Sequence, residues 1–378
     1  MKSSTGVLLL FLAIASTSCI EEFRPALKDF DNLLVVDGHI TDKPGPYTIK
    51  LSISANLDIT KYTPLSGATV TIEEENSEAE TLTETESGVY QTSANGIQGK
   101  VGRKYRLRIA TPDGKAYESG FEEIKEPTDI ASVRAEFDTR YFDEEEDPIP
   151  GYQFFVSTGP SPYEKDYYLW LMEGTFKYRA DLDITYIYEG RFIPFENADS
   201  LKTCWLTYSV EEVVTASTAN RTERQLNNVL LHFLRGDDKK LSIRYSLLAK
   251  QYSISKEAYL YWSDIEDQSA QDGSLYTSQP FQIRGNIRNV QNPDEPVLGY
   301  FFAAGVTEDR SFFNPPPELN VQLPVCGLDY EGLRFPPPPE EWPVYITTGE
   351  EGLALSGSAC LDCREAGGSI TPPDFWEE

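Results

Sequence analysis

Short runs of alternating hydrophobic and polar residues, broken by turns, limit the fold of residues 33–125 more than any other feature. Residues 47–53 and 69–72 alternate in this way, and the turns at 42–46 and 112–115 contain glycine and proline. A period of two places successive side chains on opposite faces of a sheet, so each run predicts a half-buried strand. No helical periodicity interrupts the series, and the segment therefore predicts an all-β sandwich.

The order of these runs is similar to that of a known class of sandwich. A pleated strand is followed by P-x-x-G-A-x-V at residues 64–70 and then by G-x-Y at residues 88–90. This order resembles the transthyretin-like and carboxypeptidase-regulatory-like sandwiches. The fold class expected for residues 33–125 is therefore an Ig/transthyretin-like β-sandwich, and the resemblance implies a non-catalytic spacer or docking unit.

A second, larger β-rich region is expected over residues 128–310, after a linker at 124–128. Aromatic and β-branched runs predict several of its strands. These are residues 152–156, 167–173, 183–188, 228–233 and 241–247, with paired final strands at 280–287 and 297–304. His232 lies in one of these runs without a second histidine near it, which favours a core or edge histidine with its hydrogen bonds satisfied over a ligand or base.

One prominent helix is predicted near residues 255–272. Ser255 can cap its start, and Ala258, Trp262 and Ile265 recur at helical spacing. The tyrosine and tryptophan stripe on this helix favours packing over a platform for sugar binding.

The first residues have the form of a secretory signal. One positive charge at Lys2 precedes an apolar run at residues 7–15, which is too short to span a bilayer. Small residues then lead to Cys19, whose thiol can take a diacylglycerol after cleavage. We therefore expect a lipoprotein signal peptide at residues 1–18 and a tether at 19–32. Ser16 stands where such signals usually have leucine, so an ordinary secreted protein with an incidental Cys19 is the alternative.

The net charge of −28 limits the partners of the chain. Such a charge repels nucleic acid phosphate, and no nucleic acid partner is expected. It also repels anionic lipid, so attachment to a membrane should depend on the acyl chains. Solubility outside the cell is the simplest interpretation of the charge.

Four cysteines remain beyond Cys19, and an even number in an exported chain favours disulfides. These candidates are Cys204, Cys326, Cys360 and Cys363, which allow three pairings. The C-x-x-C of the last two could instead serve a redox or zinc site. Zinc needs about four ligands, and His39 and His232 are the only imidazoles, so no metal and no cofactor are expected. A third segment, residues 311–378, is rich in proline, contains cysteines and is expected to pack on the second region.

Two late motifs connect the chain with a known family. The first is G-N-I-x-N-x-x-N-P-x-E-P-V-L-G-Y-F at residues 285–301, and the second is C-x-D-C-x-x-x-G-G-x-x-x-x-P-D-F-W at residues 360–376. With the signal and the sandwich, they resemble the Bacteroidota lipoprotein family called domain of unknown function 4249. The resemblance implies an outer-membrane or surface lipoprotein, often encoded beside TonB-dependent receptors. It implies no catalytic residue.

Acidic residues directly after the lipidated cysteine resemble a surface-export signal of Bacteroidota-type lipoproteins. Glu21 and Glu22 stand at these positions, although solvated linker charges are the simpler alternative. The expected location is thus the outer membrane, lipid-anchored by acyl chains such as palmitate and facing the cell exterior.

The favoured function is a non-enzymatic accessory of a TonB-dependent uptake system that binds a nutrient ligand or docks on the receptor. The sequence contains no G-x-S-x-G, H-E-x-x-H or phosphate-binding glycine loop. A surface adhesion or structural role is the first alternative. A glycan or peptide hydrolase that uses two carboxylates is the second.

Overall fold

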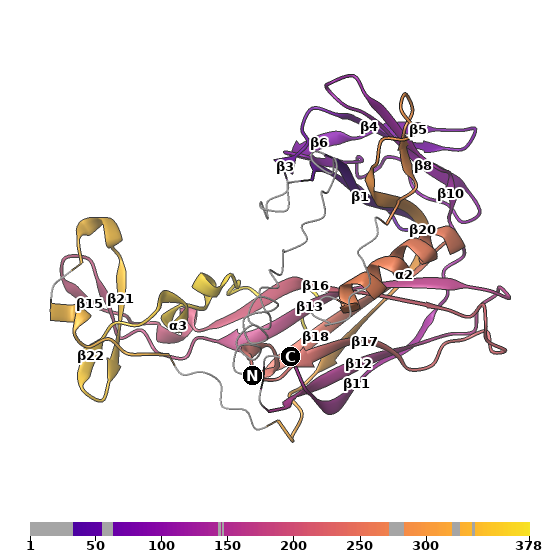
Figure 1. Ribbon diagram of the computed structural model, residues 1–378. Helices are drawn as coiled ribbons and strands as arrows, with labels where there is room; N and C mark the ends of the chain where they lie inside the picture. Colours follow the sequence, from indigo (N-terminus) through magenta and orange to yellow (C-terminus); the bar gives the residue numbers. More distant parts are fainter. Residues whose placement is uncertain are drawn as a thin grey trace, which may run out of the picture.

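The computed structural model describes residues 33–54, 63–142, 145, 147–271, 283–319, 326–334 and 337–378. It is mainly β, with 47% strand and 11% helix, as the sequence predicts. Figure 1 shows an upper sandwich, a lower group of long strands and a small sheet that projects to one side. The helix α2 (Lys256–Gln271) confirms the predicted helix, and Ser255 accepts a hydrogen bond from the amide of Ala258 at its start.

The upper sandwich consists of two sheets with one core between them. Alternation is visible in β8, where Tyr105, Leu107 and Ile109 are buried and the residues between them are not. Ile49 and Leu51 face them from the other sheet. One sheet contains β1 (Leu34–Thr41), β2 (Thr48–Ile53), β3 (Thr63–Pro64), β6 (Thr83–Glu86) and β7 (Val89–Gln91). The other contains β4 (Thr69–Glu74), β5 (Ala79–Thr81), β8 (Lys104–Ala110), β9 (Ala116–Ser119), β10 (Glu122–Glu123) and β19 (Ile287–Asn289).

Two strands from the end of the second region complete this sandwich. β19 pairs with β9, and the first half of β20 (Leu298–Phe313) pairs in parallel with β1. The expectation that residues 280–287 and 297–304 pair with each other is therefore wrong. Residues 280–282 lie outside the described residues, and Ile287 and Leu298 lie in strands of opposite sheets. The side-chain amide of Asn286 joins the two segments by bonds of 3.0 and 2.7 Å to the backbone N–H and C=O of Phe301.

The long strand β20 belongs to both halves of the molecule. Its residues up to Ala304 pair with β1, and those from Gly305 onward pair with β18 (Arg244–Ser253). The linker crosses β20 at this point. A Cβ on Gly305 would lie 2.3 Å from the carbonyl oxygen of Lys125, so only glycine fits there. One nine-stranded sheet consequently runs through both halves.

The lower half packs this large sheet against a smaller one. Its part of the large sheet has the order β16 (Thr203–Ser217), β13 (Tyr167–Arg179), β18 and β20. The smaller sheet has the order β11 (Ile130–Arg140), β12 (Ile149–Thr158) and β17 (Val229–Arg235). Phe154, Trp170 and Tyr245 fill the space between them. On the other face of the large sheet, Ala258 and Trp262 of α2 pack around Phe302, which confirms the packing interpretation of this helix.

A third unit is a small sheet that projects from the lower half (Figure 1). Its strands are β14 (Tyr186–Tyr188), β15 (Phe192–Pro194), β21 (Val344–Gly349) and β22 (Gly352–Ala354). The short helices are η1 (Ala198–Leu201), η2 (Lys239–Leu241), η3 (Gly332–Arg334), η4 (Pro339–Glu341), α3 (Ser358–Leu361) and η5 (Cys363–Ala366). None of the helices in the described ranges has the length and apolar character that a membrane crossing needs.

Candidate binding groove

A groove lies between two strands that each end a sheet. β16 ends the nine-stranded sheet, and β17 ends the three-stranded sheet. Between them is a groove of about 900 Å³, which we call the seam groove. Its lining comprises residues 208–214 of β16, residues 230–235 of β17, and the side chains of Arg140, Phe142, Lys240, Glu266 and Ser269.

A bulge in β16 brings two carboxylates to this groove. Met172 of β13 pairs with Val210 and Trp170 pairs with Val214, so three residues of β16 lie opposite the single Leu171. The extra residues include Glu211 and Glu212, both exposed. A bulge locally redirects side chains, whereas Val210 and Val214 on either side remain buried in the core.

One hydrogen bond joins the two edge strands across the groove. His232 Nδ1 lies 2.7 Å from Oε1 of Glu212, and the imidazole ring stacks on Phe154. Burial alone would raise the pKa of Glu212, but the hydrogen bond and the charge of His232 lower it below its ordinary value. Nε2 of His232 is buried and has no hydrogen-bond partner among the residues that the structure describes.

Both ends of the open edge of β16 are closed by other parts of the chain. At one end, Trp205 exchanges two backbone hydrogen bonds of 2.8 Å with Ser369 of the C-terminal segment. At the other end, Glu266 of α2 accepts hydrogen bonds from the amide and the hydroxyl of Thr215. Burial raises the pKa of Glu266, and the two bonds from Thr215 only partly offset this effect.

Most of the cations around the groove already have acidic partners. Arg235 pairs with Asp237 and Glu145, and Lys240 pairs with Asp238. Arg140 lies over the ring of Phe233, with 4.7 Å between the guanidinium carbon and the ring centroid. The groove therefore combines aromatic surface, exposed carboxylates and largely neutralised cations, a lining suited to a ligand with both apolar and polar groups.

The predicted lipidation site, Cys19, and the export residues Glu21 and Glu22 lie outside the described residues. The four later cysteines form two disulfides, Cys204–Cys363 and Cys326–Cys360. The two cysteines of the C-x-x-C motif thus have different partners. Ligand atoms of Asp181, Cys326 and Cys360 lie within 4.8 Å of one another, but the two sulfurs are joined in a disulfide and are not thiolate ligands.

The sequence analysis did not predict β16, and so it missed the groove. Glu211 and Glu212 interrupt the apolar alternation of this strand, which hides its period of two. The β-branched residues of the run T-Y-S-V-E-E-V-V-T at 207–215 were the available signal. His232 lies in an edge strand, as the sequence predicts. The expectation that its hydrogen bonds are satisfied is wrong for Nε2, which has no partner among the described residues, whereas Nδ1 is bonded to Glu212.

The comparison with known protein families agrees with the family resemblance that the motif at residues 285–301 indicates. A comparison with curated proteins finds no match. The family model described as "Domain of unknown function (DUF4249)" matches residues 20–310, which is more than half of the chain. The matched residues include strands of both sheets of the upper sandwich. In the lower half they include β16, β17 and α2. The chain therefore belongs to the DUF4249 family.

Proposed function

We propose that the protein is a surface-exposed outer-membrane lipoprotein that serves a TonB-dependent uptake system as a non-enzymatic binding component. The seam groove is the nutrient site, and Cys19 carries the lipid anchor. Glu21 and Glu22 direct the chain to the cell exterior.

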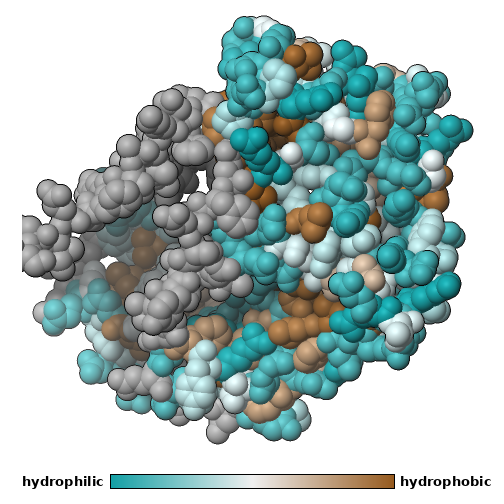
Figure 2. Space-filling view, turned by 45° about the vertical axis from the view of Figure 1, so that its right-hand side comes forward, coloured by the Kyte–Doolittle hydropathy of each residue, from teal (hydrophilic) through white to brown (hydrophobic). Residues whose placement is uncertain are grey.

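The groove between two unpaired strand edges carries this proposal. It is large enough for a small ligand, and its lining offers Tyr208 and Phe233 beside the exposed Glu211 and the half-buried Arg140. One face of the molecule also suits an extracellular setting. Figure 2 shows a mainly hydrophilic face with hydrophobic residues in small separate groups, in keeping with the charge of −28.

Binding without catalysis fits the polar groups of the groove. The pair His232–Glu212 has the arrangement of a base and the carboxylate that orients it. In the described part of the chain, no hydroxyl or thiol lies within hydrogen-bond distance of Nε2 of His232. We therefore propose that the pair joins the two edges of the groove.

Affinity purification from detergent-solubilised envelopes tests the proposal. The full chain with a C-terminal tag should recover a TonB-dependent barrel, and the Cys19→Ala variant should lose membrane attachment, acyl label and barrel together. The variant Glu21→Ala/Glu22→Ala should keep the acyl label but become inaccessible to protease added to intact cells. Recovery of free monomer alone from the wild-type chain would refute the role in uptake.

A further inference from the structure

We propose that the seam groove binds a free, extended oligopeptide of net positive charge, which adds as a strand to the edge of β16. This inference rests on the proposed function, because it names the ligand class of the same groove. Four observations support it: the direction of the edge backbone, the closed ends, the opposing edge, and the charge of the lining.

Backbone N–H and C=O groups of β16 point away from β13, along the open edge that borders the groove. The backbone of Trp205 bonds to Ser369 on the side of β16 away from β13. Backbone N–H and C=O groups of successive residues point to alternate sides of a strand. Thr207 and Ser209 therefore present their N–H and C=O groups on this outer side. Within the described ranges, no backbone hydrogen bond is found for either residue on that side. An extended peptide supplies main-chain donors and acceptors at the matching spacing, which other small ligands do not.

The edge already accepts one extended segment of the chain itself. The antiparallel bridge between Trp205 and Ser369 is a single step of strand addition. At the other end, the carboxylate of Glu266 accepts a hydrogen bond from the backbone N–H of Thr215, so this N–H is not free for a peptide. Because β16 contains the bulge, the span is measured on β13, where Lys177 and Leu169 pair with Trp205 and Thr215. The eight steps between these two residues span roughly 26 Å at about 3.3 Å per residue. Because both ends are closed, the groove fits a peptide of about eight residues and excludes a segment of a longer continuous chain.

The opposite wall of the groove also carries free backbone groups. Gly236 donates its N–H to the carbonyl oxygen of Pro150 in the neighbouring β12. Because backbone groups alternate in direction along a strand, the N–H and C=O groups of Phe233 and Arg235 point away from β12. No strand pairs with β17 on that side within the described part of the chain. Side chains of a peptide on β16 would contact the aromatic ring of Phe233 there.

Charge selects among peptides. Arg235 and Lys240 are paired with acidic residues, and Arg140 lies over the ring of Phe233. Glu211 has no ion-pair partner among the described residues, so with Glu212 it offers carboxylates to a cationic ligand. Glu212 keeps its ionised, negative form because its pKa lies below the ordinary value, and the whole chain carries −28. This field attracts cationic peptides and repels acidic ones.

The experiment uses the full chain and three pools of random octapeptides that contain lysine, only neutral residues, or glutamate. Affinity selection read by mass spectrometry should enrich the lysine pool, and a selected peptide should slow hydrogen exchange at Thr207 and Ser209. Ser209→Pro removes one edge N–H at an exposed position that tolerates proline, whereas Ser209→Ala keeps that N–H and is the matched control. We expect the proline variant to bind about tenfold more weakly and the alanine variant within about twofold of wild type.

A second arm keeps the test valid if the proline variant does not fold. In an extended peptide, amides that face β16 alternate with amides that face away from it. N-methylation of the set that faces β16 should weaken binding to the wild-type chain, and N-methylation of the other set should not. Equal binding of all methylated peptides, or no binding by any pool, would overturn the inference. If no pool binds but the barrel is still recovered by purification, the inference fails and the proposed function stands. If peptides bind as expected without any barrel, the role in uptake fails instead.

Discussion

At the scale of single residues, buried polar side chains determine how the fold responds to pH. His39 of β1 stacks on Phe302, with ring centroids 4.9 Å apart, and contacts the edge of Tyr252. Burial lowers its pKa from 6.5 to about 4, although Asp37 acts in the opposite direction and Lys250 adds to the lowering. The imidazole is therefore neutral in the folded chain at neutral pH.

The substitution His39→Phe should flatten the pH dependence of stability. The unfolded state binds a proton near pH 6.5 and the folded state only near pH 4, so wild-type stability falls as the pH drops through this window. Between pH 7.5 and pH 4.5 the loss should reach roughly 2–3 kcal/mol. Phenylalanine keeps the ring contacts but cannot titrate. Urea unfolding at pH 7.5 and pH 4.5 measures the difference, and an unchanged slope in the variant would show that His39 is not responsible.

The pair His232–Glu212 makes a smaller contribution because Glu212 is half exposed. A double-mutant cycle with His232→Gln and Glu212→Gln should give a coupling free energy of about 0.2–1 kcal/mol at neutral pH. The coupling should vanish as the pH falls through the lowered pKa of Glu212, since the carboxylate is then protonated. A coupling that persists unchanged at pH 3 would contradict the assignment.

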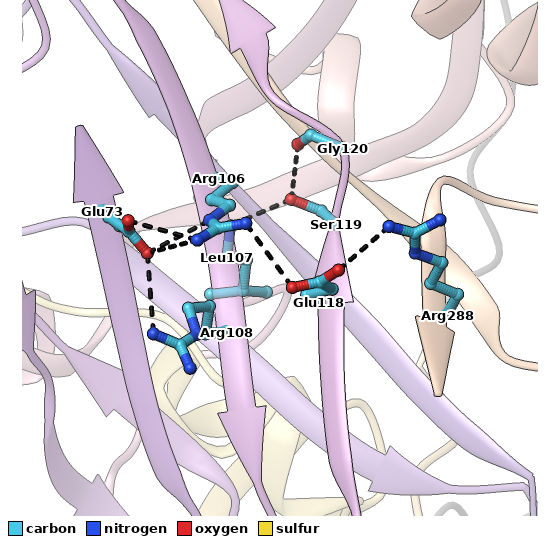
Figure 3. Close-up of polar contacts among 8 residues, drawn as sticks. All are labelled: Glu73, Arg106, Leu107, Arg108, Glu118, Ser119, Gly120 and Arg288. Carbon is cyan, nitrogen blue, oxygen red and sulfur yellow. Dashed lines mark hydrogen bonds and ion pairs between the residues drawn. The ribbon is translucent and has the colours of Figure 1, made fainter. Parts of the chain in front are cut away.

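At the scale of elements, a row of alternating charges crosses four strands of the upper sandwich (Figure 3). Arg106 of β8 bonds to Glu73 of β4 at 3.0 Å and lies 3.5 Å from Glu118 of β9. Glu118 also pairs with Arg288 of β19 at 3.0 Å, and Arg108 lies 3.7 Å from Glu73. The row thus connects β19, a late strand in sequence, to early ones.

Removal of the central carboxylate should weaken this sheet in a salt-dependent way. Glu118→Gln leaves Arg106 and Arg288 without one of their partners, and stability should fall by about 0.5–1 kcal/mol at low ionic strength. The loss should shrink in 1 M salt, where charges are screened within about 3 Å. Glu86→Gln on an exposed strand is the control, and an equal loss in both variants would show that the row has no specific role.

The disulfide Cys204–Cys363 attaches the C-terminal segment to the lower half, and Cys326–Cys360 closes a loop within that segment. Cys204 of β16 and Cys363 of η5 are fully buried, and Cys326–Cys360 lies beside them near Asp181. A non-reducing peptide map should recover these two pairs and no Cys360–Cys363 linkage. Replacement of Cys204 and Cys363 together by alanine should cost on the order of 2–5 kcal/mol. A map dominated by another pairing would contradict the structure.

Local pattern predicted the elements that follow a hydrophobic period of their own. β2, β8, β9 and α2 follow their hydrophobic periods. The hydrophobic pattern did not predict strand pairing or disulfide pairing between segments that are distant in sequence. The pairing of β20 with both β1 and β18 depends on contacts that no local period contains. The disulfide pairing likewise depends on the position of Cys363 beside Cys204, 159 residues earlier in the sequence.

At the scale of the whole molecule, the two halves share one sheet and one long strand. Residues 33–125 lack both β19 and β20, so the isolated segment would expose one edge of each of its sheets. Phe301 and Ile287 would also be missing from its core. We therefore expect the fragment 33–125 to remain unfolded by circular dichroism and to gain strand structure when a peptide of residues 283–305 is added. Cooperative unfolding of the fragment alone would contradict this expectation.

Site-specific cross-linking in intact cells tests most directly whether the seam groove is the binding site of an anchored surface protein. A photoreactive phenylalanine replaces Leu230, which lines the groove and is 40% exposed, and in a control it replaces Val101, which is 48% exposed on the upper sandwich. The account predicts peptide adducts on the acylated chain from position 230 and none from position 101. Equal adducts at both positions, or none at position 230, would contradict it.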